Sequence, residues 1–404
     1  MPNTIADNLA RLQAARTAIA NAIIAAGGDV DADDGYEEFP NDIATIPTYD
    51  VYGVEWTTKA SGNNTSLKRV GKSAGFTEPV PYFSGMTDTP SSPFDALSPW
   101  KDMTVSTIDG NSVVSIPKFY YKITKNATTN KLRILISSSA VPGFHVSPAH
   151  RDRGDGEKSV VYVGRYHSDS NYKSTSGSIP ISSITRAQAR AGSHNLGSDY
   201  WMLDFSMWVT IWLLYLVEFA NWDSQTVIGY GCGNGSSKEN TGSTDSMPYH
   251  TGTMQTSRTT YGVGVQYRWI EDPWGNVADW CDGITFNQSD VYCFENLADY
   301  SDSYQSTGAT LVGTRPTSGN YNYIQDLGVS AETGYEWFLY PFSVGSSQAN
   351  IPDCCYSYYY DSSGVVLRVG GSYYQDTGNG LFCLVGRDAA SYQSASSGAR
   401  LMVI

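Results

Sequence analysis

The sequence is poor in charged side chains, and basic ones are the scarcer kind. Only 16% of its 404 residues are charged, and 26 lysines and arginines stand against 40 aspartates and glutamates, a net charge of −14. An acidic chain is repelled by the phosphates of nucleic acids and of anionic lipids. We therefore expect no nucleic-acid partner and no binding to an anionic membrane.

Long apolar runs are also missing. The longest, Met207 to Ala220, is shorter than the roughly 20 residues of a membrane-spanning helix, and it contains Glu218. The first residues lack a basic segment followed by an apolar one, which a secretory signal would show. We expect the protein to be made in the cytoplasm and not to insert into a membrane.

Metal-binding side chains are few. The six cysteines include no Cys-x-x-Cys pair, which argues against a structural zinc site, and only five histidines occur. A reducing cytoplasm keeps cysteines reduced, so we expect mostly thiols. Glycine and tyrosine are abundant instead, with 39 and 29 residues, and 41% of the chain is hydrophobic. That composition is typical of a β-rich protein with long loops.

Residues 3–26 are predicted to form one helix. Large aliphatic side chains recur along it at heptad-like spacing: Ile5, Leu9, Leu12, Ile19 and Ile23. A helix of this length is marginal alone, so we expect it to associate, as a homotrimer. Packing on its own domain is the alternative. Residues 1–48 then comprise this helix and an acidic linker, and residues 49–102 a small β-rich segment.

A larger domain is expected over residues 103–404. Its first strands are predicted at Val113–Ile123 and Leu132–Ile136, joined by a turn at Asn126–Asn130. Asp204 or Ser206 should cap a helix that continues to about Asn221. This helix is apolar nearly all round, which predicts a buried central helix. Glu218 within it should therefore pair with a buried donor.

Aromatic and acidic side chains are concentrated between residues 268 and 283. The tetrapeptide Asp272-Pro273-Trp274-Gly275 is typical of a tight turn. Large apolar side chains flank it: Tyr267, Trp269, Trp274, Val277 and Trp280. Such rings belong in or beside a core, and the carboxylates among them need hydrogen-bond donors.

Three segments resemble one family. Gly275–Trp280 resembles the Gly-Asn-Val-Trp-Glu-Trp signature of the C-type-lectin-like fold, in the branch of formylglycine-generating enzymes and phage variable tail proteins. Val365–Tyr373 resembles its Arg-Gly-Gly-Ser-Trp strand, and Gly398–Leu401 its terminal Gly-Phe-Arg-Leu. The order is also that of the family, although Ala278 and Asp279 depart from the signature. The resemblance implies an α+β, C-type-lectin-like fold with short twisted sheets, one buried central helix and long loops.

The resemblance offers an enzymatic alternative. Formylglycine-generating enzymes bind copper through a cysteine pair shortly after the Gly-Gly-Ser strand, because Cu(I) prefers thiolates. Here Cys383 stands alone after that strand, and the adjacent Cys354 and Cys355 precede it. The related iron enzymes need a three-histidine site, which has no counterpart here. We therefore expect no catalytic residues and no enzymatic activity.

Tyrosines crowd the C-terminal region, about residues 350–395. Tyrosine gives a large, rigid contact area with a polar tip, and serine, glycine and asparagine add adaptable hydrogen bonds, as in binding loops. The alternative is that these tyrosines only cover a β-rich surface and bind no ligand. The candidate ligand-binding residues are Tyr356, Ser357, Tyr358, Tyr359, Tyr360, Asp361, Tyr373, Tyr374, Asp376, Asn379 and Tyr392.

The resemblance to phage variable proteins also implies diversification. In that family adenines of selected codons are randomised, so an AAC codon can become Tyr, Ser, Asp or Cys, but not Lys, Glu, Gln, Met or Trp. All residues from Asp353 to Ser363 belong to the permitted set, whereas Gln375 beyond them does not. This pattern marks the region as a candidate for diversification by a retroelement.

Together these features predict a phage receptor-binding protein, an adhesin at the tail tip or fibre of the virion. The opening helix and acidic linker resemble the N-terminal segments of phage tail-fibre proteins. The expected partners are a host cell-surface protein or glycan and other tail or baseplate proteins. A formylglycine-enzyme-like oxidase and a structural baseplate protein are the alternatives. No cofactor is expected, but related folds allow calcium near Asn276 and Asp279.

Overall fold

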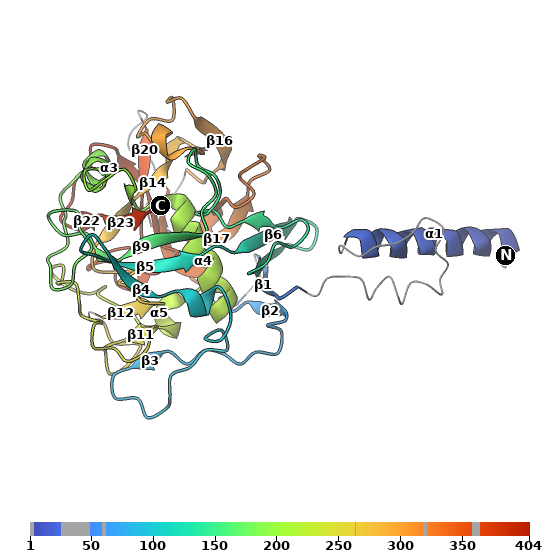
Figure 1. Cartoon of the computed structure of the whole chain (residues 1–404), viewed down its shortest axis with the longest axis horizontal. Coiled ribbons are helices and arrows are strands. Elements are labelled where there is room, and N and C mark those ends of the chain that lie inside the picture. The colour runs from blue at the N-terminus through green and yellow to red at the C-terminus, as the bar shows by residue number, and fades with distance from the viewer. Residues whose placement is uncertain (1–3, 26–48, 59–61, 263, 318–320, 358–363) are drawn as a thin grey trace.

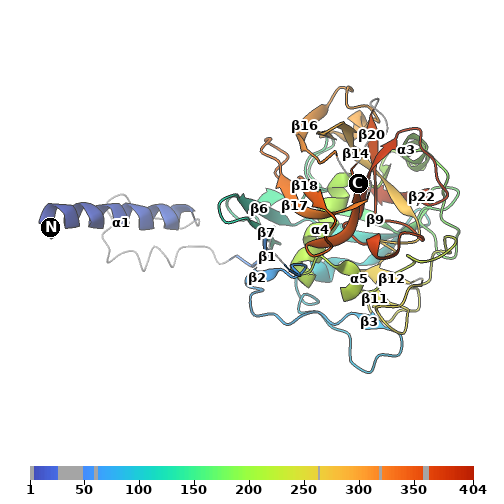
Figure 2. The same cartoon turned by 180° about the vertical axis from the view of Figure 1, so that it is seen from behind.

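The computed structural model describes residues 4–25, 49–58, 62–262, 264–317, 321–357 and 364–404. It has a mixed α+β architecture in which four sheets surround one buried helix (Figures 1 and 2). The N-terminal helix α1 (Ile5–Ala25) extends to one side of this body in both views. None of the helices in these residues is both long and apolar enough to cross a membrane.

The buried helix is α4 (Phe205–Phe219), and all of its residues are buried. It begins where the Asp204 carboxylate accepts a hydrogen bond from the Met207 amide at 2.7 Å. It ends at Ala220, whose backbone is left-handed with φ 49°. The predicted central helix and its cap are confirmed. Because α4 has no solvent face, surrounding segments must cover it on every side.

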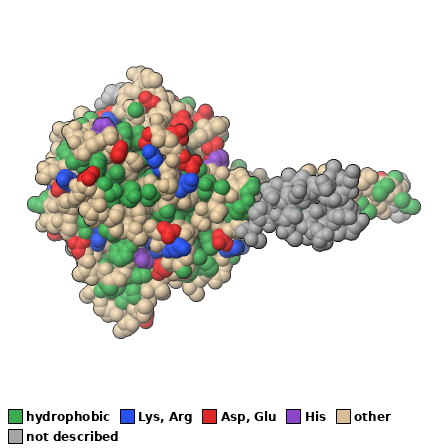
Figure 3. Space-filling model, viewed as in Figure 1, with side chains coloured by type: hydrophobic (Ala, Val, Ile, Leu, Met, Phe, Trp, Pro, Cys, Tyr) green, Lys and Arg blue, Asp and Glu red, His purple; other side chains and the backbone are tan. Residues whose placement is uncertain are grey.

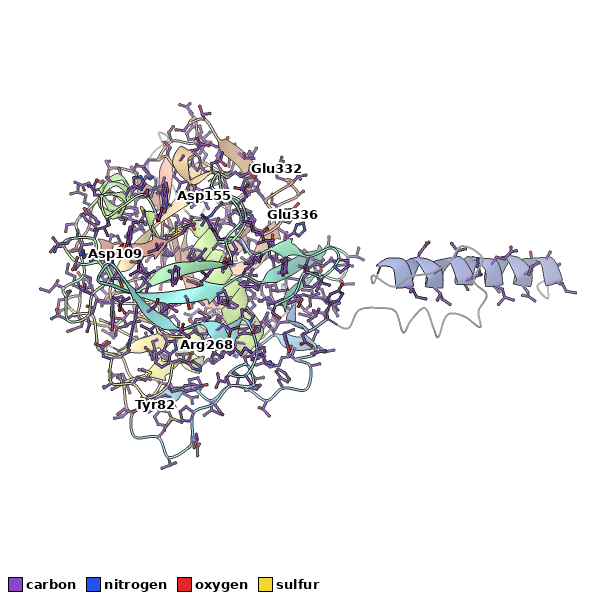
Figure 4. All side chains as sticks on the ribbon, viewed as in Figure 1. Tyr82, Asp109, Asp155, Arg268, Glu332 and Glu336 are labelled. Atoms are coloured by element: carbon purple, nitrogen blue, oxygen red, sulfur yellow. The ribbon has the colours of Figure 1, made fainter. Side chains whose placement is uncertain are left out.

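Glu218 of α4 has the buried donors that its position demands. Its two carboxylate oxygens accept hydrogen bonds from Arg268, at 3.0 Å from Nε and 2.5 Å from Nη2. Ser92 and Tyr267 donate further bonds of 2.8 Å and 3.1 Å. Arg268 is labelled in Figure 4. The prediction that Glu218 pairs with a buried donor is confirmed.

Two five-stranded sheets flank the helix. The first has the order β2 (Lys68–Gly71), β1 (Val51–Thr57), β7 (Lys131–Ser137), β6 (Tyr120–Asn126), β8 (His145–Val146). The second has the order β10 (Tyr200–Met202), β23 (Arg400–Val403), β9 (Val160–His167), β5 (Asn111–Pro117), β4 (Val105–Ile108). A small sheet contains β13 (Ile270–Glu271), β12 (Val265–Tyr267), β11 (Gly252–Thr253) and β3 (Tyr82–Phe83).

These pairings correct two sequence predictions. Strand β1 pairs along its whole length with β7, so residues 49–102 are not a segment separate from the following domain. The single strand predicted at Val113–Ile123 is two strands, β5 and β6, which belong to different sheets. The break follows Pro117, which lacks an amide hydrogen for continued pairing. The predicted turn is confirmed, since β6 and β7 form a hairpin across it.

The largest sheet carries the C-terminal region. Its strand order is β16 (Ala309–Thr314), β15 (Asp290–Phe294), β14 (Ala278–Asn287), β20 (Val365–Val369), β21 (Leu384–Ala389), β19 (Ile351–Tyr356), β17 (Asn322–Val329), β18 (Leu339–Gly345), and β22 (Ser397–Gly398) pairs with β14. Strands β14 and β20 are antiparallel neighbours, with Asp279 opposite Val369. Two of the three family-like segments are thus hydrogen-bonded to each other.

Short helices complete the body, and α1 differs from them. The body contains α3 (Arg186–His194), α5 (Ser224–Val227), and the 3-10 turns η1 (Trp100–Asp102), η2 (Leu297–Asp299) and η3 (Asp376–Gly378). On α1, by contrast, Ile5, Leu9 and Leu12 are 88%, 55% and 57% exposed. Figure 3 shows apolar side chains at the free end of this helix.

Candidate binding surface

The strand register of the large sheet aligns one row of side chains across four strands. Trp280 of β14 lies opposite Arg368 of β20, and Arg368 lies opposite Val385 of β21. Val385 in turn lies opposite Tyr356 of β19. Directly opposed residues project from the same face of a sheet. Here it is the face turned away from α4, because the alternate residues, such as Leu367, belong to the main core.

Three tyrosines meet on this face, and we call Tyr321, Tyr323 and Tyr356 the tyrosine cluster. The Tyr321 ring contacts the Tyr356 ring edge-to-face, with centroids 5.1 Å apart, and the Tyr323 ring at 5.6 Å. The Arg387 guanidinium lies 4.3 Å from the centre of the Tyr356 ring. These contacts hold the rings in fixed relative orientations, which suits a surface that must present them to a partner.

Burial affects the chemistry of Tyr356. Removal from water raises the pKa of its phenol, and the neighbouring Cys354 raises it further. Tyr356 therefore stays protonated at physiological pH and can donate a hydrogen bond as well as offer its ring. Tyr321, at the edge of the cluster, keeps 43% of its surface exposed.

Turn η3 borders the cluster on one side. A side chain at Gly378 would displace Tyr321, because a Cβ built there lies 2.2 Å from the Tyr321 hydroxyl oxygen. Just before η3, Tyr373 and Tyr374 pack edge-to-face with ring centroids 5.3 Å apart. Tyr374 is 55% exposed, and its hydroxyl accepts a bond of 3.4 Å from Ser396. Asp376, at the start of η3, is also exposed.

Tyr392 lies farther along the same face. Its ring contacts the Arg368 guanidinium at 4.7 Å and approaches Trp280 edge-to-face at 6.5 Å. It is half-buried and covers part of the row described above. Its contacts are those of a packing residue with one exposed edge.

Two candidate residues are buried and do not belong to an exposed surface. Ser357 is fully buried, because strand alternation turns it away from the face that carries Tyr356. Asn379 is fully buried as well, and its amide donates a bond of 2.9 Å to the Ser372 carbonyl. Asn379 therefore fixes the turn after β20. Tyr358, Tyr359, Tyr360 and Asp361 lie outside the described residues.

Sequence reasoning missed Tyr321, Tyr323 and Arg387. Tyr321 and Tyr323 alternate along the chain, as residues on one face of a strand do. That signal was available, but it did not show that β17 pairs with β19, where Tyr323 lies opposite Cys354. The pairing of β17 with β19 places Tyr321 and Tyr323 beside Tyr356, which sequence reasoning did select.

An open pocket of about 550 Å³ lies beside η3. Thr377 of η3 and Pro352 of β19 form one wall, and Asp223, Thr226 and Tyr230 contribute polar groups. Burial raises the pKa of Asp223, and this effect outweighs the hydrogen bonds from Thr226, which lower it. No lysine, arginine or histidine belongs to the described lining, so the cavity does not suit an anionic group.

The weak calcium candidates have other contacts. Asp279 accepts bonds from Arg400 Nε at 2.9 Å and shares one of 3.0 Å with His167 Nδ1. The Asn276 side-chain oxygen accepts a bond of 2.9 Å from the Glu239 amide. Both residues thus hold the scaffold together, and the Arg400 guanidinium occupies the place beside Asp279 that a cation would need. Within the described ranges, no group of three or more His, Cys, Asp or Glu is arranged to hold a metal ion.

Comparisons with known proteins add a structural likeness. No protein-family model matches the sequence, and no curated protein matches it. Among solved structures, the chain is similar to the Treponema denticola variable protein 1, with 10% sequence identity and a TM-score of 0.30. The matched region covers 74% of this chain and 98% of that one.

Proposed function

We propose that the protein is a ligand-binding adhesin with a C-type-lectin-like fold, carried on a phage tail, that recognises a protein or glycan on a bacterial host surface. The observation that carries the proposal is the tyrosine cluster on the outer face of the large sheet. The adjoining exposed ring of Tyr374 extends it. In this proposal the protein is not an enzyme and needs no cofactor.

Rigid aromatic rings suit recognition for an energetic reason. A side chain that is already ordered loses little conformational entropy on binding, and a tyrosine anchor contributes about 2 kcal/mol or more when a partner buries it. The strands beneath the cluster are hydrogen-bonded on both sides, β19 between β17 and β21. Several copies in one oligomer would add avidity to such anchors.

The same architecture suits diversification. Along β19 and β21, residues alternate between the main core and the outer face. Leu384 faces the core, whereas Val385 belongs to the outer row. Exposed positions near residues 350–395, such as Tyr374, can therefore vary without a change in the core. Residues 353–363, whose types match adenine randomisation, include Tyr356 of the tyrosine cluster.

Attachment assays on paired variants test the proposal. In the double variant Tyr321→Ala/Tyr374→Ala, we expect adsorption to host cells to fall by at least tenfold, because two exposed anchors are lost. The melting temperature should stay nearly constant, since exposed side chains contribute little to stability. Phe342→Ala is the matched control, because Phe342 is similarly exposed at 54% and lies outside the cluster. Full adsorption of the double variant would refute this surface as the site.

The flanking DNA tests diversification separately. We expect a near-identical, adenine-rich template copy of the segment encoding residues 350–395 beside a reverse-transcriptase gene. A genome without either would refute diversification but leave the binding surface untouched. Copper-dependent oxidation of a cysteine peptide by the purified protein would instead establish the oxidase alternative.

A further inference from the structure

Two buried cysteines that are far apart in sequence lie in contact. The sulfur atoms of Cys354 and Cys383 are 2.9 Å apart, and both side chains are fully buried. Sequence reasoning treated Cys383 as isolated and grouped Cys354 with Cys355. The structure separates those neighbours, because Cys355 belongs to the main core and Cys354 to a small cluster on the outer face.

The sheet itself sets this proximity. Strands β19 and β21 are parallel, with Cys355 opposite Leu384 and Tyr356 opposite Val385. One step back along both strands, Cys354 lies opposite Cys383. Gln375 lies beside the pair, with its Nε2 3.3 Å from the Cys354 sulfur and 3.9 Å from the Cys383 sulfur. The contact therefore follows from backbone pairing and does not depend on a flexible loop.

We propose that Cys354 and Cys383 form a disulfide bond when the protein meets an oxidising environment. With a small disulfide such as oxidised glutathione as oxidant, one protein thiolate attacks a glutathione sulfur and releases one glutathione. The second protein thiolate then attacks the mixed disulfide, forms the Cys354–Cys383 bond and releases the other glutathione. Two protons leave the protein thiols, and two electrons pass to the glutathione disulfide.

The geometry favours this bond over a shared metal ion. Two thiolates on one tetrahedral zinc, with Zn–S bonds of about 2.3 Å, lie about 3.8 Å apart. The observed separation of 2.9 Å is shorter than that and closer to the disulfide bond length of about 2.05 Å. We expect rotation of the two side chains to close the remaining gap, because the strands already hold the two residues opposite each other.

Burial controls how fast the bond forms. Loss of solvent raises the pKa of the Cys383 thiol well above its usual range, and the adjacent Cys354 raises it further. Cys383 is therefore held as a thiol until the cover beside it opens and an oxidant enters. Gln375, which is half-buried and contacts both sulfur atoms, forms part of this cover. Oxidation should be slow in the native protein and faster when this side chain is shortened.

The bond would link the two strands, β19 and β21, that lie beneath the proposed binding surface. Tyr356 lies two residues after Cys354 on the same strand face, and it contacts Tyr321. A covalent link between β19 and β21 restricts both the unfolded chain and local opening of the two strands. The inference does not depend on the proposed function, because it concerns the thiols alone.

Intact-mass spectrometry and thiol titration test the proposal. After incubation of the full chain with oxidised glutathione, we expect a mass lower by two hydrogens and a decrease from six to four titratable thiols after denaturation. Peptide mapping should join the segments that carry Cys354 and Cys383. The melting temperature of the oxidised protein should exceed that of the reduced protein by several degrees.

Variants locate the bond. Cys383→Ala should form no disulfide within the chain and lose at most one of its five remaining thiols, as a glutathione adduct. Cys355→Ala, the control beside Cys354 on β19, should still lose two. Gln375→Ala should oxidise severalfold faster. If the wild-type protein keeps six thiols, carries a lasting glutathione adduct, or links Cys354 to Cys355, the proposal is overturned. Stoichiometric zinc binding that requires both cysteines would also overturn it.

Discussion

Arg400 and Asp279 join two segments that lie 121 residues apart in sequence. Arg400 Nε is 2.9 Å from an Asp279 oxygen, and both side chains are buried. The Arg400 Nη2 also donates to the carbonyls of Glu271 and Asp272, at 3.0 Å and 2.9 Å. The C-terminal segment thereby holds the backbone of the aromatic turn in place.

Arg400→Met should destabilise the protein by about 3–5 kcal/mol, because it leaves the Asp279 charge buried with one partner fewer. Adding Asp279→Asn to that variant should recover part of the loss, since the unpaired charge disappears. Urea denaturation of the two variants measures both effects. A double variant no more stable than Arg400→Met would contradict the pairing.

Stability should fall as the pH decreases from 6.5 toward 4. Burial lowers the pKa of His150 from 6.5 to about 4. Between these pH values His150 binds a proton in the unfolded chain but not in the folded one. The contribution of His150 to the free energy of unfolding is therefore complete above pH 6.5 and is lost on acidification. The loss from this group amounts to about 3 kcal/mol. His150→Gln should show a weaker dependence of the unfolding free energy on pH across this range, measured by denaturation at each pH. An unchanged pH dependence would refute the assignment.

Trp280→Ala should cost about 3–5 kcal/mol, as truncation of a buried aromatic residue does. Trp280 is fully buried, and its indole NH donates a bond of 2.9 Å to the Ile184 carbonyl. Trp280→Phe is the milder control, since it keeps most of the ring. Thermal unfolding measures both variants, and a wild-type melting temperature for Trp280→Ala would contradict the packing.

The exposed seam of α1 should assemble the protein into a homotrimer. Ile5, Leu9 and Leu12 cover one side of a helix that leaves them more than half exposed. Burying such a stripe between copies removes apolar surface from water. Light scattering at micromolar concentration should give three times the chain mass, and deletion of residues 1–28 should give a monomer. A monomeric full-length chain would refute the prediction.

Local sequence signals sufficed where one segment determines its own structure. The apolar run of α4, its Asp204 cap and the need of Glu218 for a donor were all visible in consecutive residues. The hairpin of β6 and β7 was visible for the same reason, because a short polar turn joins two apolar strands. The aromatic stretch was also correctly expected to be buried.

Long-range register could not be derived in the same way. Nothing near Val51–Thr57 indicates that its partner is β7, and nothing near Cys383 indicates Cys354. The burial of Ser357 and Asn379 depends on where strands end, which decides the face on which each side chain lies. The residues chosen from composition therefore include exposed side chains such as Tyr374 and buried ones such as Asn379, and the sheet is needed to separate them.

The complete enclosure of α4 also constrains when the chain can fold. Trp100 donates its indole hydrogen to the Leu214 carbonyl at 3.1 Å, and the Trp212 indole donates to the Leu381 carbonyl at 2.8 Å, 169 residues later. On a ribosome, α4 emerges after β1 and β7, which contact it, but well before β14 and the segment around Leu381. Part of its apolar surface stays uncovered until the segment around Leu381 has been made. A product that stops before Leu381 therefore leaves the central helix exposed to proteases and chaperones.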